Sequence, residues 1–377
     1  MGDSRSFETY LKISRIIGLC PWKRITNNIF DVLSRVNLLV CSTVFIFTSI
    51  LTIVNKVHVI KESKHEYKFP LVVVDILEGV CGFIFMASLL TKCLFFSTDW
   101  NSLLASIQNP SSIDFATRKK KYAAFFKVIV SHAVTSCIFI FETYSWFGVA
   151  DHEKSVIEIL SAYVSLGVRF YYQFVLVCLI WELSAILEHR YNLIKVNILN
   201  IFSRDSGRVV FPKHLKQRIR VIKSDYADLY KAVSHASGFF GITILMFLAC
   251  TVAALLNSCC WGLYYGYAAK VESDWIGPLL TSVLVSPLHN LALTTFLVMA
   301  CDRVERSGEN LINACFLLLQ EMDKSDISDE LTFLVQQLQA LAPKFSAVGL
   351  FYVNRRVLST LMTFTTAYVI VILQFKN

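Results

Sequence analysis

The residues with the clearest chemical potential in this sequence are ionisable side chains inside long apolar stretches. An ionised group at membrane depth is costly, so it usually faces an oppositely charged partner or a water-filled cavity. Arg169 lies in such a stretch and needs a counterion, for which Asp75, Glu78 and Glu142 are the candidates. Other polar residues of these stretches complete the set: Tyr144, Tyr163, Asn257, His289 and Asn290.

Aromatic residues near these polar groups would form the walls of a ligand pocket, because such sites combine apolar walls with a few polar anchors. The wall candidates are Trp146, Tyr171, Tyr172, Trp261, Tyr264 and Tyr265. Two alternatives stay open. Trp146, Trp261 and Tyr264 also fit an aromatic belt at the membrane interface. Arg169 and His289 also fit a purely structural polar network.

Seven long apolar segments carry these residues. The chain is 55% hydrophobic and 17% charged, whereas a soluble domain is about 25% charged. Each segment has 20 or more residues, enough to cross a bilayer core of about 30 Å. Because lipid satisfies no backbone hydrogen bonds, the segments are expected to be helices, and the fold class is an all-α membrane protein. They cover residues 36–55, 71–96, 123–147, 156–181, 238–264, 276–300 and 350–375.

The distribution of Lys and Arg predicts the orientation. The N-terminal segment and the even-numbered loops hold 24 of these residues, and the loops on the other side hold 7. Since basic residues are retained on the cytoplasmic side, the N-terminus is predicted to be cytoplasmic and the C-terminus extracellular. This orientation disfavours a G-protein-coupled receptor, although Asp302-Arg303-Val304 resembles its D-R-Y triplet. A basic cytoplasmic side also accounts for the net charge of +8 better than binding to nucleic acid does.

Helical spacing continues into the predicted cytoplasmic parts. Apolar residues recur every three or four positions in the long basic loop at 183–237 and in a helical anchor at 301–349, which is typical of packed amphipathic helices. The organisation is therefore 1–35 cytoplasmic, 36–300 spans one to six, 301–349 anchor and 350–377 the seventh span. The stripes are Leu187, Tyr191, Ile194, Ile198 and Ile201; Leu311, Phe316, Leu319 and Met322; and Leu331, Leu334, Val335, Leu338 and Leu341.

The last segment carries the most specific pattern: Tyr368, five apolar residues, then Gln374 and Phe375. This resembles the T-Y-(five apolar)-Q-F signature of insect gustatory receptors, with Ala367 in place of the Thr. Two further stretches resemble the family, namely Gly349-Leu350-Phe351 and the run Ile17-Gly18-Leu19-Cys20-Pro21 before the first span.

The resemblance implies a tastant-gated, nonselective cation channel in the plasma membrane of sensory neurons. It implies a homotetramer, or a heterotetramer with related receptors, in which the seventh helices line the pore. It places the small-molecule tastant in the outer half of each subunit, among the second to sixth spans. Both bitter alkaloids and sugars fit the polar and aromatic candidates, and we favour bitter compounds.

Within that implied pore, Gln374 would form a ring of amides that replaces part of an ion's hydration. Val371 is three residues earlier and shares its face, so a Val371 ring would close the pore by dewetting, and Phe375 would plug the same constriction. Tyr368 faces elsewhere and is expected to pack against a neighbouring helix. A simple interfacial position for Gln374 stays open. Arg355 and Arg356 are expected at lipid headgroups or the anchor.

Other classes are less well supported. The sequence has no G-x-x-x-x-G-K-[ST], H-E-x-x-H or G-x-S-x-G motif, so we expect no enzyme, and we expect no cofactor or metal. The alternatives to a gustatory receptor are a solute transporter, or an odorant or pheromone receptor of the same superfamily. No internal repeat of the transporter kind is visible.

Overall fold

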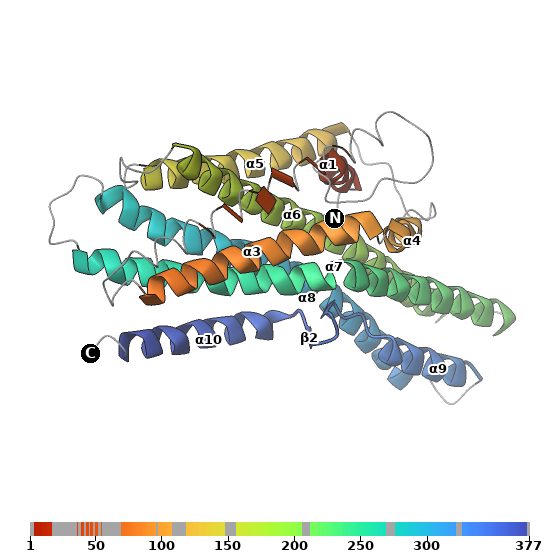
Figure 1. Cartoon of the computed structure of the whole chain (residues 1–377). Helices are drawn as coiled ribbons and strands as arrows, with labels where there is room; N and C mark the ends of the chain where they lie inside the picture. Colours follow the sequence, from red (N-terminus) through yellow and green to blue (C-terminus); the bar gives the residue numbers. More distant parts are fainter. Residues whose placement is uncertain are drawn as a thin grey trace.

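The computed structural model describes residues 4–16, 69–95, 97–107, 118–147, 156–205, 212–268, 276–321 and 326–374, with single helical positions between 36 and 54. Nearly all of this part is helical, as predicted, and the long helices pack in one bundle (Figure 1). The elements are α1 (Ser4–Ile16), α3 (Phe69–Phe95), α4 (Ser97–Ile107), α5 (Arg118–Phe147), α6 (Val156–Asp205), α7 (Pro212–Ala268), α8 (Ile276–Glu321), α9 (Asp326–Ala340), β1 (Ser346–Ala347), β2 (Phe351–Tyr352) and α10 (Arg355–Gln374).

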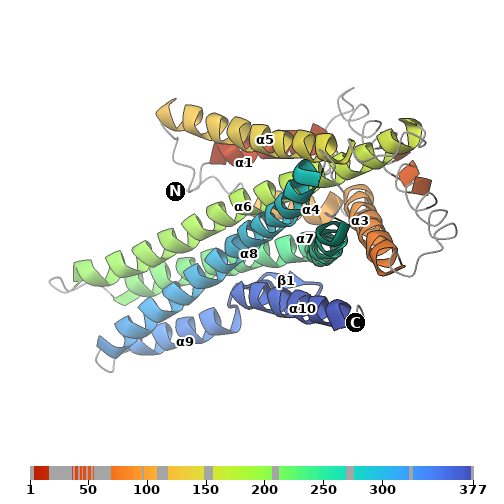
Figure 2. The same cartoon turned by 90° about the vertical axis from the view of Figure 1, so that its left-hand side faces the viewer.

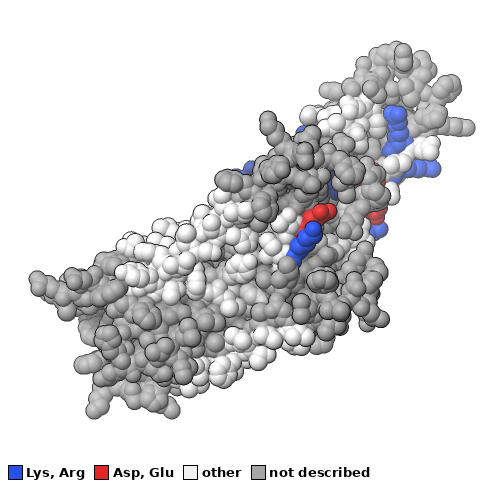
Figure 3. All heavy atoms as spheres, turned by 90° about the horizontal axis from the view of Figure 1, so that it is seen from above, with Lys and Arg blue, Asp and Glu red and all other residues white. Residues whose placement is uncertain are grey.

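The second to sixth apolar segments correspond to α3, α5, α6, α7 and α8, whereas segment 36–55 lies mostly outside the described residues. Within the described part, α3, α6, α7 and α8 are long and apolar enough to cross a membrane. The face seen in Figure 3 agrees, because its described charged side chains gather toward one end and leave much of the length uncharged.

Three helices are much longer than a membrane crossing requires. α6, α7 and α8 have 50, 57 and 46 residues. At 1.5 Å per residue these helices are about 70 to 85 Å long, against a bilayer core of about 30 Å. Their ends continue beyond the apolar segments and pack together, and α9 packs against α7 and α8. We call this part (residues 183–205, 212–237, 301–321 and 326–340) the anchor bundle.

The core of the anchor bundle confirms two of the predicted stripes. All five stripe residues of α6 are buried, as are the first four of the stripe on α9, namely Leu331, Leu334, Val335 and Leu338. The Tyr226 hydroxyl of α7 donates to the carbonyls of Leu338, at 3.0 Å, and Leu341, at 3.1 Å. These carbonyls lie at the end of α9, where a helix leaves its last acceptors unsatisfied, so the contact fixes α9 to α7.

The stripe predicted on α8 was wrong at Phe316, which is 37% exposed. Leu311 and Cys315 are buried instead. These two residues are four positions apart and share a helix face, whereas Phe316 is turned away from it by about 100°. Met322 lies outside the described residues.

The last helix begins later than the sequence predicted. Residue 350 was expected to start a continuous span, but a two-stranded hairpin comes first, with Ser346 paired to Tyr352 and Ala347 to Phe351. α10 then starts at Arg355. Asn354 provides the break, because its side-chain oxygen accepts the N–H of Arg356 at 3.2 Å, as a helix N-cap does.

The hairpin is fixed to α7 through backbone contacts. The Ser237 hydroxyl accepts the N–H of Ser346 at 2.8 Å and donates to its carbonyl at 3.1 Å. Gly241 lies one turn further along α7, where a Cβ would be 2.9 Å from the Ser346 carbonyl oxygen. The absence of a side chain at Gly241 therefore allows the hairpin to approach the helix. Figures 1 and 2 both show α10 running from this point along one side of the bundle.

The N-terminal helix is part of the packed core. α1 buries Phe7, Tyr10, Leu11 and Ser14, which share one helix face, against α6 and α5 (Figure 2). The Tyr10 and Ser131 hydroxyls hydrogen bond at 3.0 Å and tie α1 to α5.

Candidate functional site

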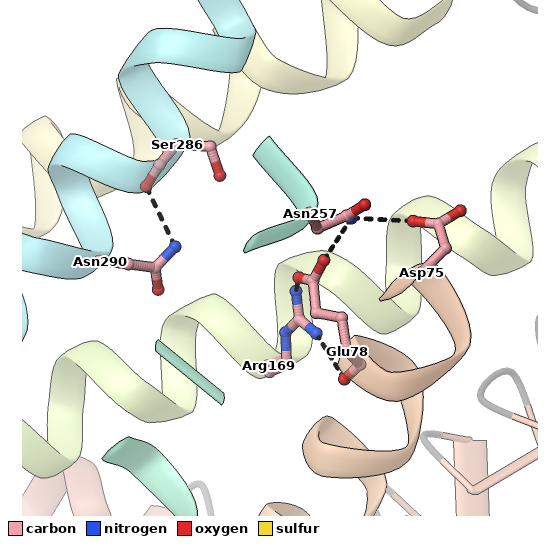
Figure 4. Close-up of polar contacts among 6 residues, drawn as sticks. All are labelled: Asp75, Glu78, Arg169, Asn257, Ser286 and Asn290. Atoms are coloured by element: carbon pink, nitrogen blue, oxygen red, sulfur yellow. Dashed lines mark hydrogen bonds and ion pairs between the residues drawn. The ribbon is translucent and has the colours of Figure 1, made fainter. Parts of the chain in front are cut away.

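Three helices bring four of the polar residues into one cluster (Figure 4). Arg169 of α6 forms an ion pair with Glu78 of α3. The side-chain amide of Asn257, on α7, donates to Asp75 at 2.8 Å and to Glu78 at 2.6 Å. We call these four residues the polar cluster. The predicted counterion of Arg169 is thus confirmed as Glu78, and Asn257 connects the two carboxylates.

The local sequence of α3 explains this geometry. Asp75 and Glu78 are three residues apart, so both carboxylates lie on one helix face. Gly82 is one turn further on the same face, where a Cβ would lie 2.9 Å from the Arg169 Cδ. The stem of Arg169 therefore lies directly against α3, and the residue is only 8% exposed.

A second polar group lies on α8. The side-chain amide of Asn290, a residue that is 2% exposed, donates to the Ser286 carbonyl at 3.0 Å. The His289 ring lies 5.8 Å from the ring of Phe170. Phe170 also has the guanidinium of Arg169 at 5.7 Å from its ring centre. Phe170 thus contacts both the polar cluster and His289, and it links the two groups.

Several buried polar atoms in this region have no hydrogen-bond partner among the described residues. They are the side-chain oxygen of Asn257, Nε2 of His289 and the side-chain oxygen of Gln173. Gln173 is 2% exposed and lies one turn beyond Arg169 on α6. An unsatisfied buried polar atom costs about 1–3 kcal/mol, so each is a natural place for a ligand group or a water. Sequence reasoning missed Gln173, for which the only signal was an amide four residues after Arg169.

The remaining pocket candidates are dispersed. Glu142 is buried on α5, at 2% exposure, while Tyr144 on the same helix is 60% exposed and lies outside the cluster. Trp261 is half-buried one turn beyond Asn257 and packs against the small apolar group formed by Val74, Leu256 and Cys260. The side chains of Trp146 and Tyr163 lie outside the described part of the structure.

The predicted pore residues lie on α10, and the C-terminal half of this helix is largely exposed. Val371 is 42% exposed and Gln374 is also exposed, whereas Phe375 lies outside the described residues. Tyr368 was expected to pack against a neighbouring helix. Within this chain it is 46% exposed and instead stacks on Phe364 of the same helix, with ring centres 6.1 Å apart. Along α10, contacts with the rest of the chain are concentrated in the first turns, at Val357, Leu358 and Leu361.

The structure places Arg355 against the anchor, one of the two positions expected for it, with a partner that the sequence did not reveal. Its Nε donates to the Asp302 carboxylate of α8 at 2.8 Å, and Nε of Arg306 forms an ion pair with the same oxygen at 2.8 Å. Arg303 lies over the Trp181 ring, 3.7 Å from its centre. Both charged members of the D-R-Y-like triplet thus make contacts within the chain. The Asp302–Arg355 pair spans 53 positions, and no spacing rule connects residues so far apart.

The chain is similar to known proteins both in sequence pattern and in fold. The sequence model of the family described as 7tm chemosensory receptor matches residues 7–377. The fold is similar to that of the insect olfactory receptor OR5 from Machilis hrabei in complex with eugenol, at 13% identity and a TM-score of 0.68, over 98% of this chain and 97% of that one. A second OR5 structure gives 13% identity, a TM-score of 0.62 and coverage of 99% and 98%. A search of curated proteins gives no match.

Proposed function

We propose that this chain, which belongs to the 7tm chemosensory receptor family, is a gustatory receptor that opens a nonselective cation channel when a tastant binds. The observation that carries the proposal is the exposure of α10. Large apolar side chains along this helix face outward, among them Met362, Phe364, Ile370 and Val371. Because α10 contacts the rest of the chain mainly in its first turns, its remaining surface is open to contact with other copies, and we expect four copies to enclose a pore lined by α10.

At the start of α10, Arg355 is paired with Asp302 of α8 within the same chain. Further along, Val371 and Gln374 are three residues apart and share a face, as a gate followed by a ring of amides requires.

The polar cluster supports a cationic tastant. The cluster holds two carboxylates and one guanidinium: Arg169 pairs with Glu78, and Asp75 accepts from the Asn257 amide. The site therefore carries an excess of negative charge when all three charged groups are ionised. The ring of Phe170 adds an aromatic face nearby. A protonated amine binds favourably to both features, which fits a bitter alkaloid better than a neutral sugar. In OR5, the complex with eugenol shows a small organic ligand bound within a similar fold.

Whole-cell recording from cells that express this chain tests the proposal. We expect a cation current in response to quinine, which carries a protonated amine, and a smaller one or none with caffeine or sucrose, which are uncharged at neutral pH. Gln374→Ala should change the relative permeability of Na⁺, K⁺ and Ca²⁺, because it removes the ring of amides. Gln374→Asn keeps an amide and serves as the matched control. Tastant uptake without current, from a chain verified at the plasma membrane, would favour a transporter instead.

A volatile ligand would favour the odorant receptor alternative. Eugenol belongs in the panel for this reason, because it is the ligand bound in the OR5 structure. A current evoked by eugenol at lower concentrations than by any soluble tastant would contradict the gustatory assignment and leave the channel proposal intact.

A further inference from the structure

One carboxylate serves two guanidiniums where α8 meets α10. Asp302 is the acceptor, and its side chain is 10% exposed. The Nε atoms of Arg306 and Arg355 each lie 2.8 Å from the same oxygen of Asp302, Arg306 as an ion pair and Arg355 also as a hydrogen-bond donor. Their side chains are 51% and 53% exposed. The acid is therefore buried, while both bases remain half in contact with the surroundings.

The two bases are attached to different parts of the molecule. Arg306 follows Asp302 by one turn on α8, so it moves with the carboxylate. Arg355 is the first residue of α10, directly after the Asn354 cap, and the hairpin before it is held on α7 by Ser237. A displacement of α10 would therefore begin at Arg355, and it would separate Arg355 from Asp302 without disturbing Arg306.

Breaking a buried ion pair is normally expensive, because it leaves a buried charge without a partner. Arg306 removes most of this penalty here. When Arg355 leaves, Asp302 keeps a guanidinium partner of its own helix. The pair with Arg355 therefore holds α10 in place. Its separation costs less free energy than it would if Asp302 had no second partner.

We infer that Asp302, Arg306 and Arg355 form a releasable latch that holds the pore helix α10 in the closed channel. Arg355 is the part that releases, and Arg306 is a positioning residue that keeps Asp302 paired after release. This inference rests on the proposed function, in which α10 lines the pore. It gives the two arginines opposite roles, although both pair with the same carboxylate oxygen.

The opposite roles define the experiment. Arg355→Gln removes the latch, so we expect a larger current without tastant and a lower half-maximal tastant concentration. In Arg306→Gln, release of Arg355 leaves Asp302 without an ionic partner, so the half-maximal concentration should rise by roughly tenfold. Arg356→Gln is the matched control, because its side chain is exposed and only its backbone is used in the cap. The tastant is whichever of quinine, caffeine, sucrose and eugenol evokes a wild-type current.

A second readout requires no current. Amide hydrogen exchange over residues 355–361 is measured on the purified full-length chain in lipid nanodiscs. Exchange should become faster than in the wild type in Arg355→Gln and slower in Arg306→Gln, since Asp302 then has Arg355 as its sole partner of the two. If the contact were merely structural, both variants would exchange faster.

The outcomes separate the two proposals. Faster exchange in both arginine variants, or no change in either, would overturn the latch whatever the currents show. Shifts of the half-maximal concentration in the same direction for both would do so as well. A wild-type chain that gives no current while showing the opposite exchange effects would support the latch and count against the proposed channel function.

Discussion

The two charged clusters of this molecule are built in opposite ways. In the polar cluster the one guanidinium, Arg169, pairs with Glu78, and the Asn257 amide links that carboxylate to Asp75. The side chains of Arg169 and Glu78 are 10% and 14% exposed. At the start of α10 one carboxylate serves two guanidiniums that are each about half exposed. The polar cluster joins α3, α6 and α7 through a single cation, Arg169. In the second cluster Asp302 has two cations, Arg306 and Arg355, and both are partly exposed.

The number of cations in a cluster decides whether the cluster fixes its helices or allows one of them to move. A buried cluster with one cation holds its helices only while every member stays, because each loss strands a charge. A cluster with a second cation on the same helix tolerates the departure of the first. The same ionic chemistry can therefore fix one region and release another.

The largest effect that tests this comparison is expected from Arg169→Met set against Arg355→Met. Loss of Arg169 leaves Asp75 and Glu78 in the bundle without their cation, at a cost of about 3–5 kcal/mol. The amount of folded chain should fall several-fold, as measured by size-exclusion chromatography of a fluorescently tagged protein and by surface biotinylation. Arg355→Met should stay near the wild type, because Asp302 keeps Arg306.

A rescue sharpens this result. Glu78→Gln in the Arg169→Met background removes one of the stranded charges while keeping an acceptor for the Asn257 amide. Folded yield should recover in part. Equal yields for the two single variants would show that the clusters do not differ in the way proposed here.

A smaller effect is expected from replacing two glycines by alanine. Here the larger loss of stability is expected beside the hairpin that precedes α10, and the smaller one at the polar cluster. A Cβ at Gly241 would lie 2.9 Å from the Ser346 carbonyl oxygen and 3.0 Å from the Val348 nitrogen, which are backbone atoms of the hairpin. A Cβ at Gly82 would meet the Arg169 Cδ at 2.9 Å, an atom of a flexible side chain. Both positions lie in helices, so alanine gains the same helix propensity of about 1 kcal/mol at each.

Gly241→Ala should therefore lower the thermal unfolding midpoint of the purified chain by a few degrees, because overpacking against backbone costs about 1–3 kcal/mol. Gly82→Ala should change the midpoint by less. A larger loss at Gly82 would mean that the stem of Arg169 has no room to adjust, and that the polar cluster is the more tightly packed region.

Some features of these regions could be predicted from the sequence and others could not, and each outcome has a physical reason. The pairing of Arg169 was predictable because an isolated charge in an apolar stretch demands a counterion nearby in the bundle. The stripes of α6 and α9 were predictable because burial on one helix face repeats every three or four residues. Phe316 was misplaced because a hydrophobic residue beside a stripe looks like a member of it.

The features that the sequence did not reveal depend on tertiary placement. The Asp302–Arg355 contact joins residues 53 positions apart, and it exists because the hairpin returns the chain to α8. The late start of α10 depends on the cap by Asn354, which a continuous apolar pattern concealed. Gln173 is one neutral amide, and its unsatisfied oxygen is evident only when the packing around α6 is known.

The smallest effect is expected from Glu305, which extends the comparison to pH. Glu305 lies beyond the apolar part of α8. Burial raises its pKa, the neighbouring carboxylates of Glu309 and Asp302 raise it further, and Lys344 and a hydrogen bond with Asn354 oppose the shift. Because the folded-state pKa is raised, the stability that protonated Glu305 contributes is complete below the ordinary carboxyl pKa of about 4.3. It is lost as the pH rises through the raised value.

Glu305→Gln is neutral at every pH and keeps an acceptor for the contact with Asn354. Its thermal unfolding midpoint should exceed that of the wild type by about 1 °C at pH 7, and the gap should close as the pH falls toward 4. Glu309→Gln removes only one repulsive neighbour, so it should act in the same direction and less strongly. A wild type that is more stable than Glu305→Gln at pH 7 would mean that Lys344 and Asn354 outweigh burial. The carboxylates at the start of α10 would then stabilise the junction as anions, and the contrast with the polar cluster would be one of exposure alone.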